Sequence, residues 1–430
     1  VTSQHAYEFS NYLHADEWNI IPDNSVAVKN FISRFVFLPY VGRAAEIVLF
    51  LLSTMTIVEI LNNNGCFDFI SQLLRTRKSK RMLWTLAIVT FIISANLDNL
   101  TTTVMMLTIM HGIIPSRRQR MFYGSAILLA ANCGGALTVI GNPEGLVLWN
   151  GGLVTATAFS MALFLPCLAA WLIPTYMISR QLPERVETEW IVMPYRGDDT
   201  RLNVWQRLVM LFVGIGGLWF IPTFHNITKL SPFLGALCVL AILWVVNEIF
   251  NRKLMNMDAM VDRRTPRVLQ YGVIQMILFV MGIMMAVAVV KETGAFNALT
   301  EYLGVNEQNP SVWTHGVVAG VISTVLDNFA TAINFFSLPD LPLQNELLEG
   351  MTDYSCNGLY WQVIAYCVMA GGNVLGIGTV SGLALMKMER MRITWFFRNV
   401  GWKALLGGVI GLAILWLSHN LVSGATCLLI

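Results

Sequence analysis

Two stretches of this sequence share one pattern and decide its fold: Ser94-Ala95-Asn96-Leu97-Asp98-Asn99-Leu100-Thr101-Thr102 and Ser323-Thr324-Val325-Leu326-Asp327-Asn328-Phe329-Ala330-Thr331. Both read Ser-x-x-Leu-Asp-Asn-apolar-x-Thr, and both lie inside long apolar runs with no other acidic or basic residue close by. A carboxylate within the hydrocarbon of a bilayer is costly, so its default interpretation is functional. Asp98 and Asp327 therefore predict a transport site that is built from both halves of the chain.

A glycine pair follows each motif, Gly134-Gly135 after the first and Gly371-Gly372 after the second. Seven residues beyond the first glycine of each pair stands another glycine, Gly141 or Gly378. Glycines at this spacing, with a proline in the first copy, are expected to break the spanning segments 121–149 and 359–378 into half-helices. Close helix packing is the alternative role for the glycine pairs.

The composition is that of a polytopic membrane protein. Of the 430 residues, 55% are hydrophobic and only 13% are charged, with a mean hydropathy of +0.60, whereas soluble domains carry about 25% charged residues. The net charge of +2 points to no particular partner, and we expect the bilayer but no nucleic acid. Seven scattered cysteines form no metal motif, so neither a zinc site nor any other cofactor is expected.

Apolar segments divide the chain into two similar halves. We expect a polar N-terminal segment at 1–35, which starts at a processed or truncated end, and a first transmembrane repeat at 36–178. A hydrophilic linker at 179–203 then leads to a second transmembrane repeat at 204–430. The predicted full spans are 44–61, 153–178, 204–220, 231–249, 268–290 and 404–421, with a basic amphipathic linker at 387–403 before the last one.

The loops around the two aspartate motifs differ in charge. The first apolar segment, 82–115, lies between the basic clusters 75–81 and 117–120, whereas the flanks of the second, 312–336, contain acidic residues and no Lys or Arg. Because basic loops stay in the cytoplasm, the two segments are expected to enter from opposite membrane faces.

Length limits how far each of these segments reaches. The 17 residues from Arg81 to Asp98 span about 25 Å as a helix, a little less than the ~30 Å hydrocarbon core. The simplest arrangement is a re-entrant helical hairpin with its turn near Asp98, and a second one around Asp327. Two such hairpins in opposite orientation predict an inverted-topology repeat with the site at the bilayer midplane.

The residues at the hairpin tips suit cation and proton binding. Carboxylate, amide and hydroxyl oxygens are hard ligands for small cations, and burial favours the protonated form of a carboxyl group. A proton and a cation would then compete for the same oxygens, which is the minimum machinery of a cation/proton antiporter. A helix cap or a salt bridge is the alternative for each aspartate, but neither hairpin contains a basic partner. The predicted binding residues are Asp98, Asn99, Thr101, Thr102, Asp327, Asn328 and Thr331, with Na+ at Asp98 and Asp327.

A second set of residues is expected to line the ion path rather than to hold the charge. It comprises Ser94, Gly134, Gly135, Gly141, Asn142, Ser323, Gly371, Gly372, Asn373 and Gly378. Glu144, inside the first interrupted segment, is a further possible member.

Several of these motifs together resemble one transporter family. They are the runs 50–52 and 55–59, both Leu-Asp-Asn motifs, and the glycine-rich runs 134–141 and 371–378. From about Glu46 to the last span, the chain resembles the NhaD-type Na+/H+ antiporters of the ArsB/NhaD permease family, within the superfamily of arsenite, citrate and dicarboxylate carriers. The resemblance implies an inverted repeat with two hairpins, exchange of Na+ or Li+ for protons, a homodimer with elevator-like motion, and residence in a bacterial inner membrane.

The chain departs from the family pattern at two places. After Gly141 the family usually has Gly-Asp followed by Thr, whereas this chain has Asn142-Pro143-Glu144-Gly145, which moves the acidic charge to Glu144. Asn373 is also bulkier than the residue expected at that tip. Both departures bear on ion choice and stoichiometry rather than on the fold.

Two other functions compete with cation exchange. A Na+-coupled dicarboxylate symporter of the same superfamily has the same architecture, but two aspartates repel an anionic substrate. An intramembrane aspartyl protease also uses two aspartates, yet its carboxyls share a proton and work on a peptide. The repeated Asn and Thr are coordinating groups rather than acid/base partners, so a transporter is favoured over an enzyme.

Overall fold

The computed structural model describes residues 29–67, 70, 74, 76, 78–186, 202–251, 273–293, 312–338 and 352–427. The named elements within these ranges are all helices, mostly α-helices with three π-helical segments and one short 3-10 turn. Besides these helices, the described residues contain an isolated antiparallel β-bridge between Lys78 and Arg185. The predicted all-α class is therefore confirmed.

Six helical stretches in the described residues are long and apolar enough to cross a membrane. They are Lys29–Asn63, Ala156–Ser179, Val204–Thr228, Pro232–Asn251, Leu359–Glu389 and Ile393–Leu421. These stretches confirm a polytopic membrane protein. Five of them overlap predicted spans, and Leu359–Glu389 contains the second interrupted segment. The predicted span 268–290, whose first residues lie outside the described ranges, is not among the six. The first stretch extends further than expected, because a π-helical segment (Ile32–Phe37) continues into α3 (Leu38–Asn63) without a break.

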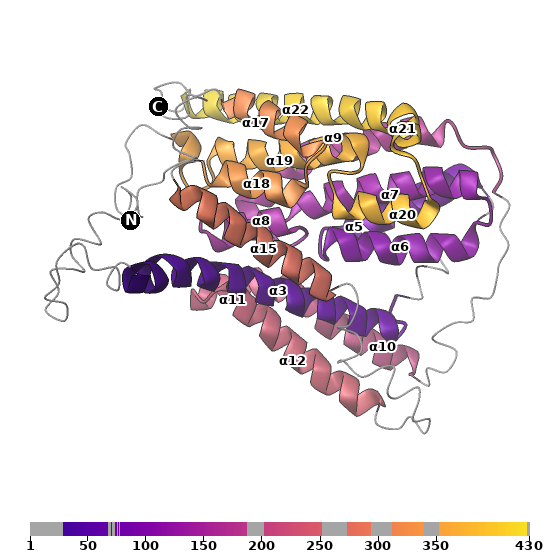
Figure 1. Cartoon of the computed structure of the whole chain (residues 1–430). Coiled ribbons are helices and arrows are strands. Elements are labelled where there is room, and N and C mark those ends of the chain that lie inside the picture. Colours follow the sequence, from indigo (N-terminus) through magenta and orange to yellow (C-terminus); the bar gives the residue numbers. More distant parts are fainter. Residues whose placement is uncertain are drawn as a thin grey trace, which may run out of the picture.

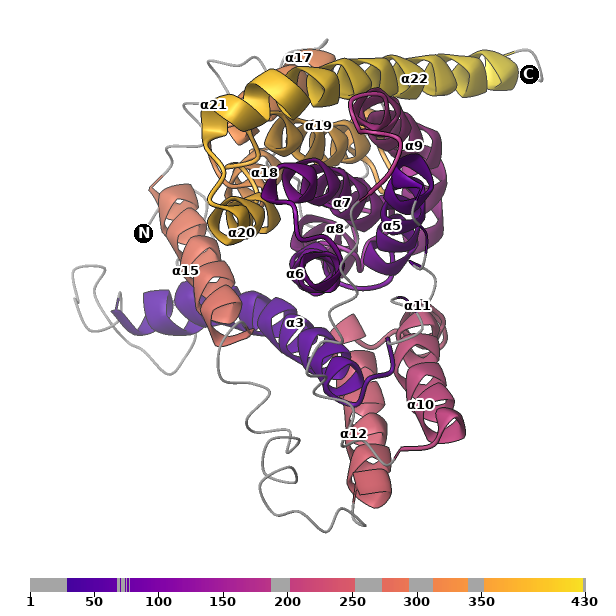
Figure 2. The same cartoon turned by 90° about the vertical axis from the view of Figure 1, so that its right-hand side faces the viewer.

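The helices form two groups that Figures 1 and 2 separate clearly. One group holds α3, α10 (Val204–Leu211), α11 (Gly217–Thr228) and α12 (Pro232–Asn251), in which α12 packs on α3 and on α11. The other is a larger bundle in which α9 (Ala156–Ser179) packs against α22 (Trp402–Cys427). Between the groups, α15 (Val273–Glu292) contacts α3 and the helix that follows the second aspartate motif. The larger bundle contains both aspartate motifs.

Both aspartates lie between two consecutive helices. In the first half, α5 (Ser79–Ser94) ends before Asp98 and α6 (Asn99–Ile113) begins after it. In the second half, α17 (Val312–Ser323) and α18 (Asn328–Phe336) flank Asp327 in the same way. A short break at each motif is therefore present where the sequence predicts a turn.

The glycine-rich segments are interrupted helices, as the sequence predicts. The first consists of α7 (Arg117–Leu137) and α8 (Pro143–Asn150), and the second of α19 (Leu359–Leu375) and α20 (Val380–Glu389). Proline stands at the first position of α8, where its missing N–H costs nothing. Gly376 ends α19 with a φ of +71°, a left-handed conformation that glycine adopts without strain. These local signals explain why neither segment continues as one helix.

Several sequence predictions concern residues outside the described ranges. These are most of the polar segment 1–35, most of the linker 179–203, the start of the span 268–290, and most of the acidic flanks of the second motif, 301–311 and 338–358. The domain boundaries and the charge-based orientation of the two halves consequently remain predictions.

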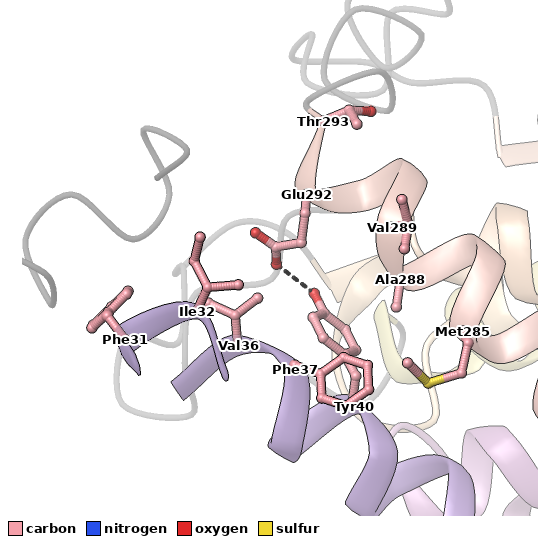
Figure 3. Close-up of a pocket in the computed structure, with 10 residues that line it drawn as sticks. All are labelled: Phe31, Ile32, Val36, Phe37, Tyr40, Met285, Ala288, Val289, Glu292 and Thr293. Atoms are coloured by element: carbon pink, nitrogen blue, oxygen red, sulfur yellow. Dashed lines mark hydrogen bonds between the residues drawn. The ribbon is translucent and has the colours of Figure 1, made fainter. Parts of the chain in front are cut away.

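A pocket of about 320 Å³ lies between the start of α3 and the end of α15 (Figure 3). Apolar side chains such as Phe37 and Met285 form most of its wall, and Tyr40 donates a hydrogen bond of 2.9 Å to Glu292 at its rim. None of its lining residues belongs to the aspartate motifs, so this pocket is separate from the candidate site.

Candidate functional site

The first aspartate caps a helix with one of its two oxygens. Asp98 is the N-cap of α6, and its Oδ2 accepts hydrogen bonds from the Thr101 amide at 3.0 Å and the Thr101 hydroxyl at 3.2 Å. An acidic N-cap satisfies an unpaired amide and suits the positive end of the helix dipole. Asp98 is buried, yet its Oδ1 has no hydrogen-bond partner among the described residues.

The second aspartate makes the corresponding cap. Oδ2 of Asp327 accepts hydrogen bonds from the amides of Phe329 at 3.0 Å and Ala330 at 3.3 Å, at the start of α18. Unlike Asp98, this side chain is only half-buried. The two motifs therefore share their capping geometry but differ in exposure.

Each motif is joined to the glycine loop of its own half by the same backbone hydrogen bond. The amide of Asn99 donates to the carbonyl of Gly141 at 3.2 Å, and the amide of Asn328 donates to the carbonyl of Gly378 at 2.8 Å. The start of α6 thus lies beside the loop that precedes α8, and the start of α18 lies beside the loop that precedes α20.

The serines of the two motifs also have matching partners. Ser94 ends α5 and its hydroxyl donates to the carbonyl of Ala131 in α7 at 2.6 Å. Ser323 ends α17, and its hydroxyl oxygen lies within hydrogen-bond distance of the Val368 carbonyl in α19, at 2.9 Å, and of Oδ1 of Asn328, at 2.7 Å. Both serines hold helices together rather than offering free oxygens.

The glycine pairs let these helices approach closely. A Cβ added at Gly134 would overlap the carbonyl of Phe91 in α5, and one added at Gly371 would overlap the carbonyl of Gly320 in α17. A Cβ at Gly135 would lie 2.7 Å from the carbonyl oxygen of Gly141. Close packing, which was one of the two predicted roles, is the role that the described contacts display.

The helix after each aspartate packs against the short helix of the other half. The helix capped by Asp98, α6, contacts α20, and the helix capped by Asp327, α18, contacts α8. Figures 1 and 2 show α6 and α20 side by side. The short helices α8 and α20 also have polar N-caps. Asn142 at the start of α8 accepts from the Gly145 amide, and Thr379 at the start of α20 accepts from the Gly382 amide. The contacts bring the starts of four helices into one region.

An amide network connects the two halves at this region. The Asn132 side chain donates to Oδ1 of Asn373 at 2.8 Å and to the Thr379 hydroxyl at 3.4 Å, and it accepts from Asn99 at 3.4 Å. Asn132 and Thr379 were not among the predicted site residues, although Asn132 breaks an apolar run and Thr379 directly follows Gly378. A polar residue within two positions of a predicted ion-lining glycine is the signal that would have found them.

Several buried oxygens in the region have no hydrogen-bond partner among the described residues. On the α6–α20 side they are Asp98 Oδ1, Thr102 Oγ1 and Ser381 Oγ, and on the α18–α8 side they are Thr331 Oγ1 and Glu144 Oε2. Burying a polar group without a partner costs roughly 1–3 kcal/mol. Five such groups lie on helices that pack together, so this region contains more buried polar oxygens than its described hydrogen bonds satisfy.

Glu144 is the third carboxyl group of this region. It lies in the first turn of α8, is buried, and is within electrostatic range of both Asp327 and Asp98. Ser381 occupies the corresponding position near the start of α20. The two sides of the region therefore have matching helix starts, but Glu144 gives the α18–α8 side a second carboxyl group that the α6–α20 side lacks.

The sequence matches a known transporter family. The family model described as citrate transporter matches residues 18–344. The chain belongs to this citrate transporter family. Membership confirms a transporter and excludes the intramembrane protease considered above.

Curated relatives of this citrate transporter family member include sodium/proton antiporters. Sodium/proton antiporter 1 of Arabidopsis thaliana is 31% identical over 391 residues, which cover 88% of this chain and 63% of that protein. The chain thus spans less than two thirds of that relative. Sodium/proton antiporter 2 of Arabidopsis thaliana is 28% identical over 88% of this chain and 86% of its own length. The Na(+)/H(+) antiporter NhaD of Alkalimonas amylolytica is 28% identical over 88% of this chain and 78% of its own length. The resemblance to NhaD-type antiporters is thereby confirmed.

The structure of this citrate transporter family member brings most of the predicted site residues together. Asp98, Asn99, Thr101 and Gly141 meet in one half, and Asn328, Gly378 and their neighbours meet in the other. Thr101 also stabilises the cap, because its amide and hydroxyl both donate to Asp98. Direct binding of ions by these residues stays a prediction.

Proposed function

We propose that this chain exchanges Na+ or Li+ for H+ across a membrane, with Asp98 and Asp327 binding either the cation or the proton. The observation that carries the proposal is the arrangement of Asp98 and Thr102. Each has a buried oxygen without a partner among the described residues, and both lie at the start of one helix. Carboxylate and hydroxyl oxygens are ligands for a small hard cation.

The cap at Asp98 offsets the repulsion between a helix N-terminus and a cation. A helix N-terminus carries a partial positive charge, which repels a cation. Oδ2 of Asp98 is bound to the Thr101 amide and places a negative charge at that end, while Oδ1 has no donor among the described residues. In the proposed exchange, a cation that binds Oδ1 displaces the carboxyl proton, and rebinding of a proton releases the cation.

We infer that the site consists of two subsites with different charge. The first subsite would combine Asp98 and Thr102 of α6 with Ser381 of α20, and the second would combine Asp327 and Thr331 of α18 with Glu144 of α8. The packing of α6 on α20 and of α18 on α8 supports this pairing. Because of Glu144, the second subsite contains a pair of carboxyl groups, so it would retain a proton or a cation more readily.

We further propose that the two aspartate motifs are tips of re-entrant hairpins in an inverted repeat. Matching caps, matching hydrogen bonds from Asn99 and Asn328, and matching glycine contacts support a repeat. Irregular backbone within a membrane is tolerated where protein covers it, as the buried first motif is covered here. The expected homodimer and bacterial inner membrane stay predictions, since two of the relatives come from a plant.

A second candidate function is the uptake of citrate or another dicarboxylate with a cation. The description of the matching family favours it, and helix N-termini suit anionic groups. Three carboxyl groups in one region oppose it, because they repel a polycarboxylate in a weakly screened site. Relatives named sodium/proton antiporter at 31% and 28% identity also support cation exchange.

The proposal is tested with the purified chain in liposomes that enclose a pH-sensitive dye. Adding Na+ or Li+ to one side is expected to release protons in the wild type, whereas Asp98→Asn and Asp327→Asn are expected to be silent. Potassium serves as the ion control, and radiolabelled citrate uptake is measured on the same preparation. Citrate uptake without any Na+-driven proton signal would instead establish the symporter function.

A further inference from the structure

A buried glutamate forms a charged cluster at the end of α20. Glu389 is the last residue of that helix, and its side chain is 1% exposed. Nε of Arg120 donates to both carboxylate oxygens, at 3.0 and 3.1 Å, and Nδ1 of His111 lies 3.1 Å from Oε1. Arg120 is at the start of α7 and His111 is in the last turn of α6. The cluster therefore joins the first half of the chain to the second.

Two arginines of α7 also bind the helix ends on either side of the cluster. Arg120 donates from Nη1 to the carbonyls of Ile114 at 3.1 Å and Pro115 at 2.7 Å, just past the end of α6. Arg117 donates to the carbonyls of Glu389 at 3.0 Å and Arg390 at 2.9 Å, at the end of α20. Basic side chains satisfy C-terminal carbonyls and suit the negative end of the helix dipole. The same two side chains thus fix the ends of both helices.

The position of the cluster relates it to the candidate ion site. Asp98 caps the start of α6 and Thr379 caps the start of α20, and the two helices pack along each other (Figures 1 and 2). Both helices therefore begin at the candidate site and end near Glu389. A change in their relative position at the cluster would move Asp98 relative to Thr379 and Ser381.

His111 and Arg120 contact the same carboxylate. His111 is 48% exposed, whereas the Glu389 side chain is 1% exposed. Lys387 and Arg390 on the α20 side, and Lys80 and Arg81 on α5, are exposed, and no ion pair joins them to His111 or Glu389 among the described residues. Arg120 and His111 are therefore the side chains that hold the Glu389 carboxylate in the described part of the chain.

We propose that Glu389 is a positioning residue for cation binding, that it holds α6 against α20 through Arg120, and that the contact with His111 adds to this hold. The inference rests on the antiport function proposed above. Glu389 does not touch the ion, and it acts by keeping Asp98 and the start of α20 in register.

Transport kinetics in liposomes test the proposal. Glu389→Gln is expected to raise the apparent KM for Na+ several-fold between pH 6 and 8.5, with a much smaller change in the maximal rate. His111→Gln, which leaves the pair of Arg120 and Glu389 in place, is expected to raise KM less than Glu389→Gln does. Exchanging the charges in Arg120→Glu/Glu389→Arg is expected to restore some of the affinity. Arg118→Gln, which removes an exposed charge from the same turn of α7, is the matched control.

A second measurement separates this proposal from the transport function. Glu389→Gln is expected to speed amide hydrogen exchange in the last turns of α6 and α20, relative to Arg118→Gln. An unchanged KM in Glu389→Gln, or unchanged exchange in both helices, would overturn the positioning role. A wild type without Na+-driven proton release would overturn the proposed function, while the exchange experiment would still decide whether the cluster holds the two helices.

Discussion

Asn132 donates a hydrogen bond to Asn373 across 2.8 Å, and these two buried amides belong to the two interrupted helices, α7 and α19. The bond joins residues that are 241 positions apart in the sequence. Asn132 also accepts from Asn99, the neighbour of Asp98. The side-chain network therefore extends from one aspartate motif into the other half of the chain.

Removal of Asn132 is expected to destabilise the protein and to change its transport. Asn132→Ala leaves Oδ1 of Asn373 without its donor, which costs about 1–3 kcal/mol for a buried polar group. Asn132→Ala/Asn373→Ala is expected to be less destabilising than the sum of the two single changes, because both partners are then absent. Thermal unfolding in detergent gives all three values. Strict additivity would show that the amides do not interact.

Alanine at the first glycine of each pair is expected to be strongly destabilising. The new Cβ at Gly134 or Gly371 overlaps a backbone carbonyl of the neighbouring helix, and such overpacking costs about 1–3 kcal/mol. Gly282 in α15 is the matched control, because a Cβ there meets nothing within 4 Å. Gly282→Ala is expected to be neutral or to stabilise by up to about 1 kcal/mol. Melting temperatures of the three variants decide the comparison.

The threonines with free hydroxyls are expected to matter for affinity and not for stability. Thr102→Val and Thr331→Val each remove a buried hydroxyl that lacks a partner among the described residues, so the folded state should keep or gain stability. The apparent KM for Na+ is expected to rise about 2- to 10-fold, the equivalent of about 0.5–1.5 kcal/mol for one polar contact. Thr103→Val is the control on the same helix, since the Thr103 hydroxyl already donates to Asn99 at 2.7 Å. Equal effects in Thr102→Val and Thr103→Val on KM would refute a ligand role for Thr102.

Acidification is expected to weaken cation binding by competition. Protonation removes the negative charge that the cation needs, so the apparent KM for Na+ should rise as pH falls, by up to about tenfold per pH unit for each competing proton. The maximal rate at saturating Na+ should change less. Initial rates at a series of Na+ concentrations across the range from mildly acidic to alkaline pH measure both quantities. If the KM for Na+ does not vary with pH, the cation and the proton do not compete for the same oxygens.

Glu144 is expected to contribute to this pH dependence. Glu144→Gln removes one carboxyl and is predicted to flatten the rise of KM at low pH while transport continues. Ser381→Ala, at the corresponding position of the other short helix, is expected to raise KM without changing the slope. If Glu144→Gln retained the wild-type slope, the acid would be a packing residue rather than a member of the second subsite.

The sequence predicted those features that depend on neighbouring residues. A turn at each aspartate motif was predicted from segment length and flanking charge, and a break after each glycine pair was predicted from glycine and proline. The described residues have a helix break at all of these places. The aspartate N-caps, which the sequence offered only as the alternative role, are present as well. Apolar length likewise predicted most of the spans. The sequence predicted a basic amphipathic linker at 387–403 but did not predict that Glu389 and Lys403 are buried. Their burial depends on helices that are distant in the sequence.

Sequence alone thus determined an all-helical membrane chain with two repeated motifs, since hydropathy, helix caps and helix breakers act over a few residues. Tertiary structure decided that α6 meets α20, that α18 meets α8, and that Asn132 reaches Asn373. Such pairings depend on how helices cross, and crossing is set by the packing of whole faces. No local pattern specifies which of many apolar faces will meet, so the partners of the aspartates and of Glu389 became visible only in the folded chain.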